Sequence, residues 1–188
     1  MTIEINRHAR ISTAGLPVCA LGSIEASTTA QALVTCRDSL VGTGIFTAHI
    51  EIPEQAPFPA RGRMLAFNAV SHGRHVILAH VFGRQPLPTG QVLTLTFQRP
   101  ERGTFGTVLS LKLPELAADW GHVTGFELDL HRRYRFRNRW RSVISASCPA
   151  PRGFDFAPFP AARGTYYLSD GRVINRLVSG RCQVDPQH

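Results

Sequence analysis

Apolar and charged residues alternate most regularly over residues 123–137 of this chain. The even positions carry Phe126, Leu128, Leu130, Arg132, Tyr134 and Phe136. The odd positions carry Glu127, Asp129, His131, Arg133, Arg135 and Arg137. Successive side chains of a β-strand point to opposite faces, so this pattern predicts a strand with one core-facing side and one charged side.

The same strand is predicted to turn back on itself as a hairpin. Asn138 follows it, at a position where a tight turn needs a residue that tolerates positive φ. Residues 140–148 form the expected returning limb, which ends at Cys148 and the strand-stopping Pro149. The rest of our interpretation is organised around this hairpin.

Short alternating segments separated by glycine and proline turns fill most of the remaining chain. They lie at residues 1–6, 44–52, 63–68, 75–82, 91–97, 103–113, 164–168 and 172–178. Residues 154–162 are rich in proline, and we expect a loop there. Residues 29–36 are rich in Ala and Leu and predict a helix, capped by Ser27 or Thr28. The fold class predicted is mostly β, an antiparallel β-sandwich or flattened barrel with one short α-helix near residues 28–37.

The length and composition suit one globular domain. The chain has 188 residues, of which 43% are hydrophobic and 18% charged, so disorder is not expected over most of its length. We predict a single domain over residues 1–188 with a frayed tail at 185–188. No apolar run approaches the ~20 residues that span a bilayer, so no transmembrane segment is expected.

The beginning of the chain alternates like a strand already under way, with Ile3 and Ile5 on one side. It has none of the basic, apolar and small-residue regions of a signal peptide. We therefore expect a signal peptide and a missing N-terminal strand or segment upstream of Met1. The alternative is a cytosolic protein.

The formal net charge of +8 predicts attraction to anionic partners such as nucleic acid, acidic polymers or anionic lipid. Nearly all of the positive charge comes from arginine, because Lys112 is the only lysine. Arginine suits bidentate contacts with phosphate or carboxylate. A G+C-rich genome explains the same preference without any binding role.

The four cysteines are Cys19, Cys36, Cys148 and Cys182. None lies in a CxxC pair or at zinc-finger spacing from a histidine pair, so no structural metal site is predicted. Two disulfides have three possible connectivities, and we favour Cys19–Cys36 with Cys148–Cys182 because each closes within one end of the chain. Oxidised cysteines predict an exported protein, whereas four buried thiols would fit the cytosol.

Arginines give the hairpin its candidate binding surface. The residues concerned are Arg133, Arg135, Arg137, Arg139 and Arg141. The first three repeat at ~6.6–6.8 Å along one strand face, near the spacing of phosphates along a polymer backbone. Tyr134, Phe136 and Trp140 are expected on the opposite, core-facing side, which argues against base stacking and against nucleic acid as a partner. A solvated face that prevents edge-to-edge pairing is the competing explanation.

Catalytic and metal sites have weaker support. A hydrolase would use Asp119 with His122, or the group His72, His75 and His80, but no nucleophile elbow or carboxylate pair accompanies them. His80 alternates with core positions, so a buried structural role is expected for it. We predict no metal, no cofactor and no catalytic residue.

Several phrases together resemble an uncharacterised group of predicted exported, β-rich proteins from actinobacteria. They are residues 15–19 (GLPVC), 36–44 (CRDSLVGTG), 65–68 (LAFN), 120–123 (WGHV), 133–137 (RYRFR) and 148–153 (CPAPRG). The resemblance covers roughly residues 4–182. Members of that group typically carry a signal peptide and a further β-rich stretch before the point where this chain starts. The resemblance implies export and a disulfide-linked β fold, and it implies no activity.

These observations together predict a non-catalytic exported or cell-envelope module that binds an anionic polymer or cell-wall component through the arginine hairpin. Two alternatives remain open at this point. One is a secreted hydrolase of unknown substrate. The other is a cytosolic nucleic-acid-binding protein, which free thiols would favour.

Overall fold

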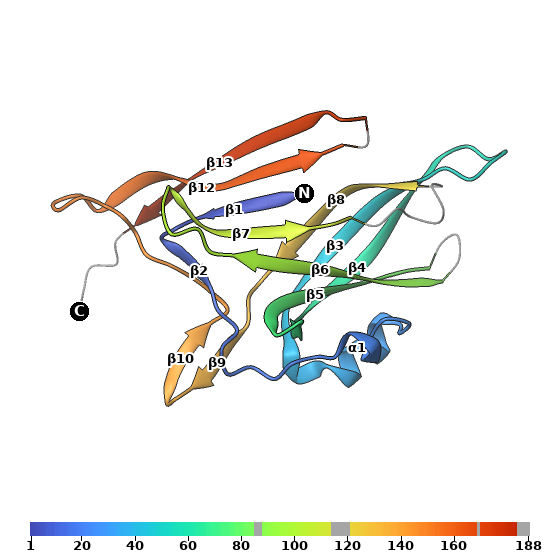
Figure 1. Cartoon of the computed structure of the whole chain (residues 1–188), viewed down its shortest axis with the longest axis horizontal. Coiled ribbons are helices and arrows are strands. Elements are labelled where there is room, and N and C mark those ends of the chain that lie inside the picture. Colours follow the sequence, from blue (N-terminus) through green and yellow to red (C-terminus); the bar gives the residue numbers. More distant parts are fainter. Residues whose placement is uncertain (85–87, 114–120, 169, 184–188) are drawn as a thin grey trace. The chain divides into compact units, whose positions relative to one another are not determined.

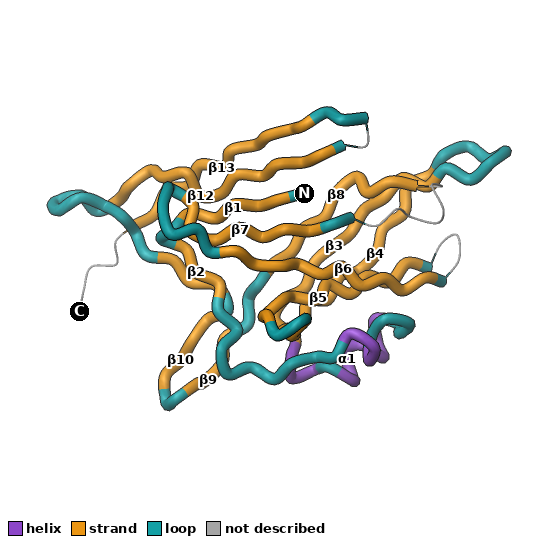
Figure 2. Tube along the Cα trace, viewed as in Figure 1, coloured by secondary structure: helices purple, strands orange, loops and turns teal. Residues whose placement is uncertain are grey.

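Strands dominate the computed structural model of the protein, which describes residues 1–84, 88–113, 121–168 and 170–183. A single α-helix occurs within those residues. Figure 2 shows the strands in orange and the helical segments in purple. The predicted fold class is confirmed: the protein is mostly β, antiparallel, of sandwich or flattened-barrel type, with one short α-helix. The chain forms two compact units. The single domain over residues 1–188 stays a prediction, and the expected frayed tail at 185–188 lies outside the described residues.

The first unit combines three stretches of chain, Met1–Ser12, Thr96–Leu111 and Ile144–His188. Its strands (Figure 1) are β1 (Thr2–Asn6), β2 (Ala9–Ile11), β7 (Phe105–Leu111), β11 (Ile144–Ala146), β12 (Phe156–Tyr167) and β13 (Val173–Gln183). Four of these are hydrogen-bonded in the order β13-β12-β1-β7, and β2 pairs with β11. Both partners of the opening strand β1 therefore lie within the printed sequence.

β12 occupies residues that we expected to form a proline-rich loop, and that expectation is wrong. Pro158 and Pro160 lie opposite Arg181 and Ser179 of β13. Alternate residues of a strand direct their N–H groups to the same side, so two prolines at this spacing fit where both positions face away from the partner strand. The side chain of Asn6, at the end of β1, donates a hydrogen bond to the Pro160 carbonyl at 2.8 Å, so this carbonyl points away from β13 and toward β1.

The second unit combines Thr13–Leu95 with Lys112–Val143. Its strands are β3 (Leu40–Ile50), β4 (Phe58–Ser71), β5 (Arg74–Gly83), β8 (Gly121–Asp129), β9 (Arg133–Phe136) and β10 (Arg139–Ser142). β6 (Thr89–Gln98) belongs to it up to residue 95. These strands are hydrogen-bonded in the order β6-β5-β4-β3-β8, and β9 pairs with β10 as a separate hairpin.

The helical elements of the second unit precede its strands. They are η1 (Leu21–Ser23), α1 (Thr29–Thr35) and η2 (Arg37–Ser39). Thr28 caps α1 and exchanges hydrogen bonds with Gln31, so the helix starts with a complete capping box. α1 lies beside β4 and β5 (Figure 1), and Ala32 is its buried residue. The predicted position of the helix is confirmed, and of the two capping residues predicted, Ser27 and Thr28, the structure has Thr28.

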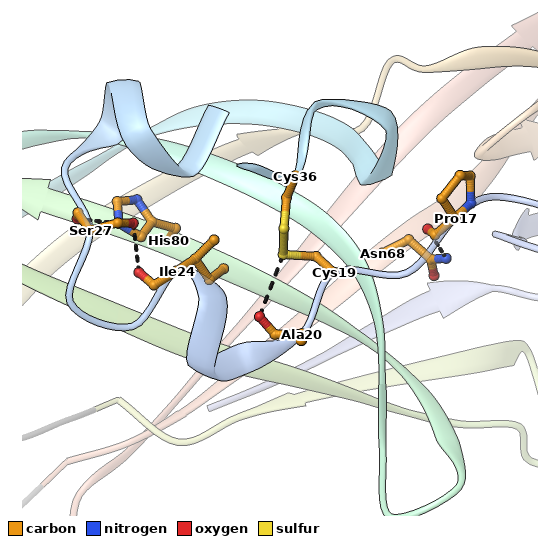
Figure 3. Close-up of a disulfide and its surroundings, with 8 residues drawn as sticks. All are labelled: Pro17, Cys19, Ala20, Ile24, Ser27, Cys36, Asn68 and His80. Carbon is orange, nitrogen blue, oxygen red and sulfur yellow. Dashed lines mark hydrogen bonds between the residues drawn. A yellow bond between two sulfur atoms is a disulfide. The ribbon is translucent and has the colours of Figure 1, made fainter. Parts of the chain in front are cut away.

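A disulfide and the helix cover one face of the central strands. The core cluster there consists of Cys19, Ile24, Ala32, Cys36, Leu65, Phe67, Ala69, Val76 and Leu78. Cys19 and Cys36 form a disulfide with a Cα–Cα distance of 5.5 Å (Figure 3). In the first unit, Cys148 pairs with Cys182 of β13 at a Cα–Cα distance of 5.4 Å. Both disulfides have the predicted connectivity.

Candidate functional site

The arginine hairpin consists of β9 and β10, joined by a two-residue turn. Arg137 and Asn138 have φ values of 50° and 59°. Positive φ at both central residues is the hallmark of the type I′ turn, whose twist matches that of the two strands it joins. Asn138 tolerates this conformation well, as the sequence indicated. The turn therefore fixes the register of the hairpin, with Phe136 opposite Arg139.

Contacts within the second unit anchor this hairpin at its base. Tyr134 is buried, and its hydroxyl donates a hydrogen bond to the Ala14 carbonyl at 3.0 Å. The backbone N–H of Val143 donates a hydrogen bond to the Arg132 carbonyl at 2.9 Å. The guanidinium of Arg132 donates one to the Leu40 carbonyl, also at 2.9 Å. The hairpin is thus a supported structure whose exposed arginines are held on a fixed backbone.

The long strand predicted over residues 123–137 is interrupted in the structure. β8 ends at Asp129 and pairs with β3, whereas β9 begins at Arg133 and has β10 as its one partner strand in the described part of the chain. The alternation nevertheless persists across the break. Every odd position from 127 to 137 is exposed, and every even position from 126 to 136 is buried or half-buried.

Trp140 lies on the opposite side from the one expected. The two-residue turn places odd positions of β9 opposite even positions of β10, so Trp140 lies directly across the strand pair from Arg135. Directly opposed residues of an antiparallel pair point to the same face. Trp140 is 69% exposed and lies beside Arg133, whose guanidinium carbon is 5.8 Å from the ring centroid. The prediction that this aromatic side chain faces the core is wrong.

The same register divides the five arginines among three positions. Arg133 and Arg135 share one face with Trp140, whereas Arg139 and Arg141 lie opposite Phe136 and Tyr134 on the other face. Arg137 stands in the turn between them. The prediction of one continuous arginine face therefore holds for Arg133 and Arg135 and does not extend along β10.

Positive charge on the hairpin has no counterion within the described part of the chain. All five arginines are exposed, and none belongs to the salt bridges formed there. Residues 133–142 contain no carboxylate. Arg137 and Arg141 instead lie over the ring of Phe136, at 5.3 and 5.4 Å from its centroid. Among the described residues, an anion at the hairpin would therefore displace no carboxylate from these arginines.

The histidines considered for a hydrolase are not brought together. His72 and His75 are exposed at the β4–β5 turn, whereas His80 is completely buried. Asp119 lies outside the described residues. His122 is an exposed residue of β8 near Glu51 and His49, a grouping that the sequence analysis missed. The sequence does show His49 and Glu51 at alternate positions of one predicted strand, on the same side of it. Nothing in the sequence indicated that β8, which carries His122, pairs with that strand.

His80 contacts Ser27 without forming a catalytic pair. Its Nε2 lies 2.8 Å from the Ser27 carbonyl oxygen and 3.3 Å from the Ser27 hydroxyl oxygen (Figure 3). A carbonyl oxygen only accepts hydrogen bonds, so Nε2 carries the proton and cannot take one from the hydroxyl. That hydroxyl donates to the Ile24 carbonyl at 2.8 Å instead. His80 is a structural residue that joins β5 to the segment before α1.

The sequence matches no known protein family and no curated protein, and no solved structure matches the chain. Its geometry and charge are therefore the basis for the function proposed below.

Proposed function

We propose that the protein is a non-catalytic exported or cell-envelope module that binds an anionic polymer through the arginine hairpin. The observation that carries the proposal is the set of five exposed arginines in residues 133–141, without an ion pair among the described residues. A polymer with regularly spaced phosphate or carboxylate groups would supply the missing counterions.

Charge repulsion supports a role in binding. Arg133 and Arg135 share one face of β9, and Arg139 and Arg141 share one face of β10, so like charges stand one strand repeat of ~6.6–6.8 Å apart on each. Residues 133–142 contain no carboxylate that would offset this repulsion. A bound polyanion relieves this repulsion, and arginine forms bidentate, charge-assisted hydrogen bonds with phosphate and carboxylate groups. The affinity gained would therefore depend strongly on ionic strength.

Preorganisation supports the same role. Arg133 lies over Trp140, and Arg137 and Arg141 lie over Phe136. Exposed cation–π contacts of this type are worth about 0.5–1 kcal/mol each and restrict the arginine side chains before a ligand arrives. Less conformational entropy is then lost on binding.

The disulfides support an extracellular location. Structural disulfides form and persist in oxidising compartments, and both cysteine pairs of this chain are joined. Among the described residues, no helix has the length and apolar character required to cross a membrane. A cell-wall or extracellular polymer is accordingly the partner proposed here.

Single-stranded nucleic acid is a second candidate partner because of Trp140. An exposed aromatic ring beside arginines is the usual platform on which unpaired bases stack, at about 1–3 kcal/mol per base. Tyr134, Phe136 and Trp140 were all expected to face the core, where no base could stack on them, but the ring of Trp140 is exposed.

Charge reversal tests the proposal. Binding to poly(glycerol phosphate) and to an oligo-dT strand is measured for the wild type and for R133E/R135E. The matched control is R61E/R63E, which reverses two exposed arginines at the same spacing on β4 of the same unit. Both variants change the net charge equally, so general electrostatic attraction affects them alike.

We expect R133E/R135E to lose at least about tenfold in affinity for poly(glycerol phosphate), because each charge-assisted hydrogen bond contributes roughly 1.5 kcal/mol or more. R61E/R63E should lose much less. Equal losses in the two variants would refute a hairpin site. Tighter binding of oligo-dT that W140A abolishes would favour the nucleic-acid candidate instead.

A further inference from the structure

Three side chains of the types that ligate metals, His49, Glu51 and His122, lie close together at one end of the β3–β8 pair in the second unit. His49 of β3 and His122 of β8 are directly opposite each other in the strand register. Glu51 follows His49 by two residues, just beyond the end of β3. One imidazole nitrogen of each histidine and one carboxylate oxygen of Glu51 all lie within 4.8 Å of one another.

The alternation of β3 explains why these side chains project outward. Phe46, Ala48 and Ile50 are buried, whereas Thr47 and His49 are half-buried, so the odd positions point away from the buried face of the strand. Cβ atoms of directly opposed residues are about 4.5–5.5 Å apart, which brings the imidazole of His122 alongside that of His49. The two ring centroids are 5.7 Å apart, and the ring planes are nearly perpendicular at 89°.

The spacing of the donor atoms suits a small tetrahedral cation. His122 Nδ1 lies 3.8 Å from Glu51 Oε1. Zinc bonds to nitrogen and oxygen are about 2.0–2.2 Å long, so two ligand atoms on tetrahedral zinc are about 3.3 Å apart. Small side-chain rotations close this gap, and the half-exposed side chains of His122 and Glu51 have the room to make them.

We propose that His49, Glu51 and His122 form a binding site for Zn²⁺. Two imidazoles and one carboxylate are an established zinc ligand set, and three protein ligands leave one tetrahedral position open for water or an anionic ligand. The ligands lie on the exposed face of the β3–β8 pair, so the metal can enter from solvent. The proposal does not depend on the arginine hairpin.

Other histidines of the described chain provide the control. His131 also lies near a carboxylate, with Nδ1 3.6 Å from Asp129 Oδ2, but this pair has no third ligand. His49, Glu51 and His122 are the one group of three or more such ligands among the described residues. H131A therefore removes an exposed histidine beside an acid without touching the proposed site.

Isothermal titration calorimetry with ZnCl₂ tests the site in tag-free, disulfide-intact protein. We expect one Zn²⁺ to bind per chain. H49A and H122A should each weaken this binding by at least about tenfold, because loss of groups that merely support a ligand already costs 10–100-fold in metal affinity. H131A should bind like the wild type. Zinc binding unchanged in H49A and H122A, or absent from the wild type, would overturn the proposal.

An NMR measurement on the wild type does not depend on how the variants fold. Addition of Zn²⁺ should shift the ring C–H resonances of His49 and His122 together and leave those of His131 in place. Shifts of His131 alone, or of all exposed histidines to a similar extent, would contradict a specific site. Replacement of Zn²⁺ by Co²⁺ should produce the intense visible absorption of tetrahedral cobalt in the wild type and in H131A, and its loss in H122A.

Discussion

The ring of Phe136 lies against the backbone of Gly15, where no side chain fits. A methyl group at position 15 would stand 2.1 Å from Cδ2 of Phe136, and Gly15 has a φ of +86°. G15A therefore combines a steric clash with a strained backbone. We expect it to lower the free energy of unfolding by about 1–3 kcal/mol, measured by denaturant unfolding.

Gly22 offers the matched control for this variant. Nothing lies within 4 Å of a methyl group at position 22. G22A should stay within about 0.5 kcal/mol of the wild type. Similar losses for the two variants would show that the contact between Gly15 and Phe136 does not support the hairpin.

A carboxylate–guanidinium pair gives the first unit a dependence on pH. Arg163 of β12 lies opposite Glu4 of β1 and donates a hydrogen bond from Nη2 to Oε1 at 2.7 Å and another from Nε to Oε2. These hydrogen bonds hold the pKa of Glu4 below its ordinary value, although partial burial opposes them. The folded state is therefore stabilised above the unfolded pKa of about 4.3, and this contribution is lost as the pH falls through the folded pKa.

The variant E4Q should accordingly be less stable than the wild type at pH 7, with the difference vanishing at low pH. Unfolding free energies measured across this range check the prediction. E101Q changes an exposed glutamate of the same unit and should leave the pH profile unaltered. An E4Q profile parallel to that of the wild type would contradict the assignment.

The two disulfides should differ modestly in their contributions to stability. Cys19 and Cys36 are 17 residues apart, whereas Cys148 and Cys182 are 34 apart. In the chain-entropy account the shorter ring contributes about 3 kcal/mol, and doubling the ring adds about 0.6 kcal/mol. Denaturant unfolding of the double variants C19S/C36S and C148S/C182S measures both values. A negligible loss in either variant would contradict a stabilising role for that disulfide.

Asn68 should be one of the most sensitive polar residues of the second unit. Its side chain is completely buried and donates a hydrogen bond to the Pro17 carbonyl at 2.9 Å (Figure 3). It donates another to the Leu16 carbonyl at 3.2 Å. N68A leaves both acceptors without this donor and should cost about 1–3 kcal/mol in thermal or chemical unfolding. The exposed Asn175 provides a control, since N175A should cost less than about 0.5 kcal/mol.

Local patterns predicted those parts of the fold that depend on neighbouring residues. The alternation around Tyr134, the cap at Ser27 or Thr28 and the turn at Asn138 are each determined within a few positions of the chain. The alternation and the turn are confirmed, and Thr28 is the cap of the two that were predicted. The cysteine pairing was also predictable, because each pair is close enough in sequence for a short ring.

Features that depend on register could not be predicted in this way. A turn one residue longer would have placed Trp140 on the other face, and the sequence did not specify the length of the turn. His122 and His49 are far apart in sequence and adjacent only because β8 pairs with β3. β12 was missed for the same reason. Its prolines are tolerated because their positions point away from β13, which depends on the register of the two strands.

The two covalent rings do not interleave along the chain. Cys36 closes its ring long before Cys148 appears in the sequence, and each ring lies within one compact unit. A polypeptide that emerged amino end first could complete the earlier linkage before either later thiol became available to compete. Oxidative maturation would then require only an electron acceptor, without reshuffling of mispaired sulfurs.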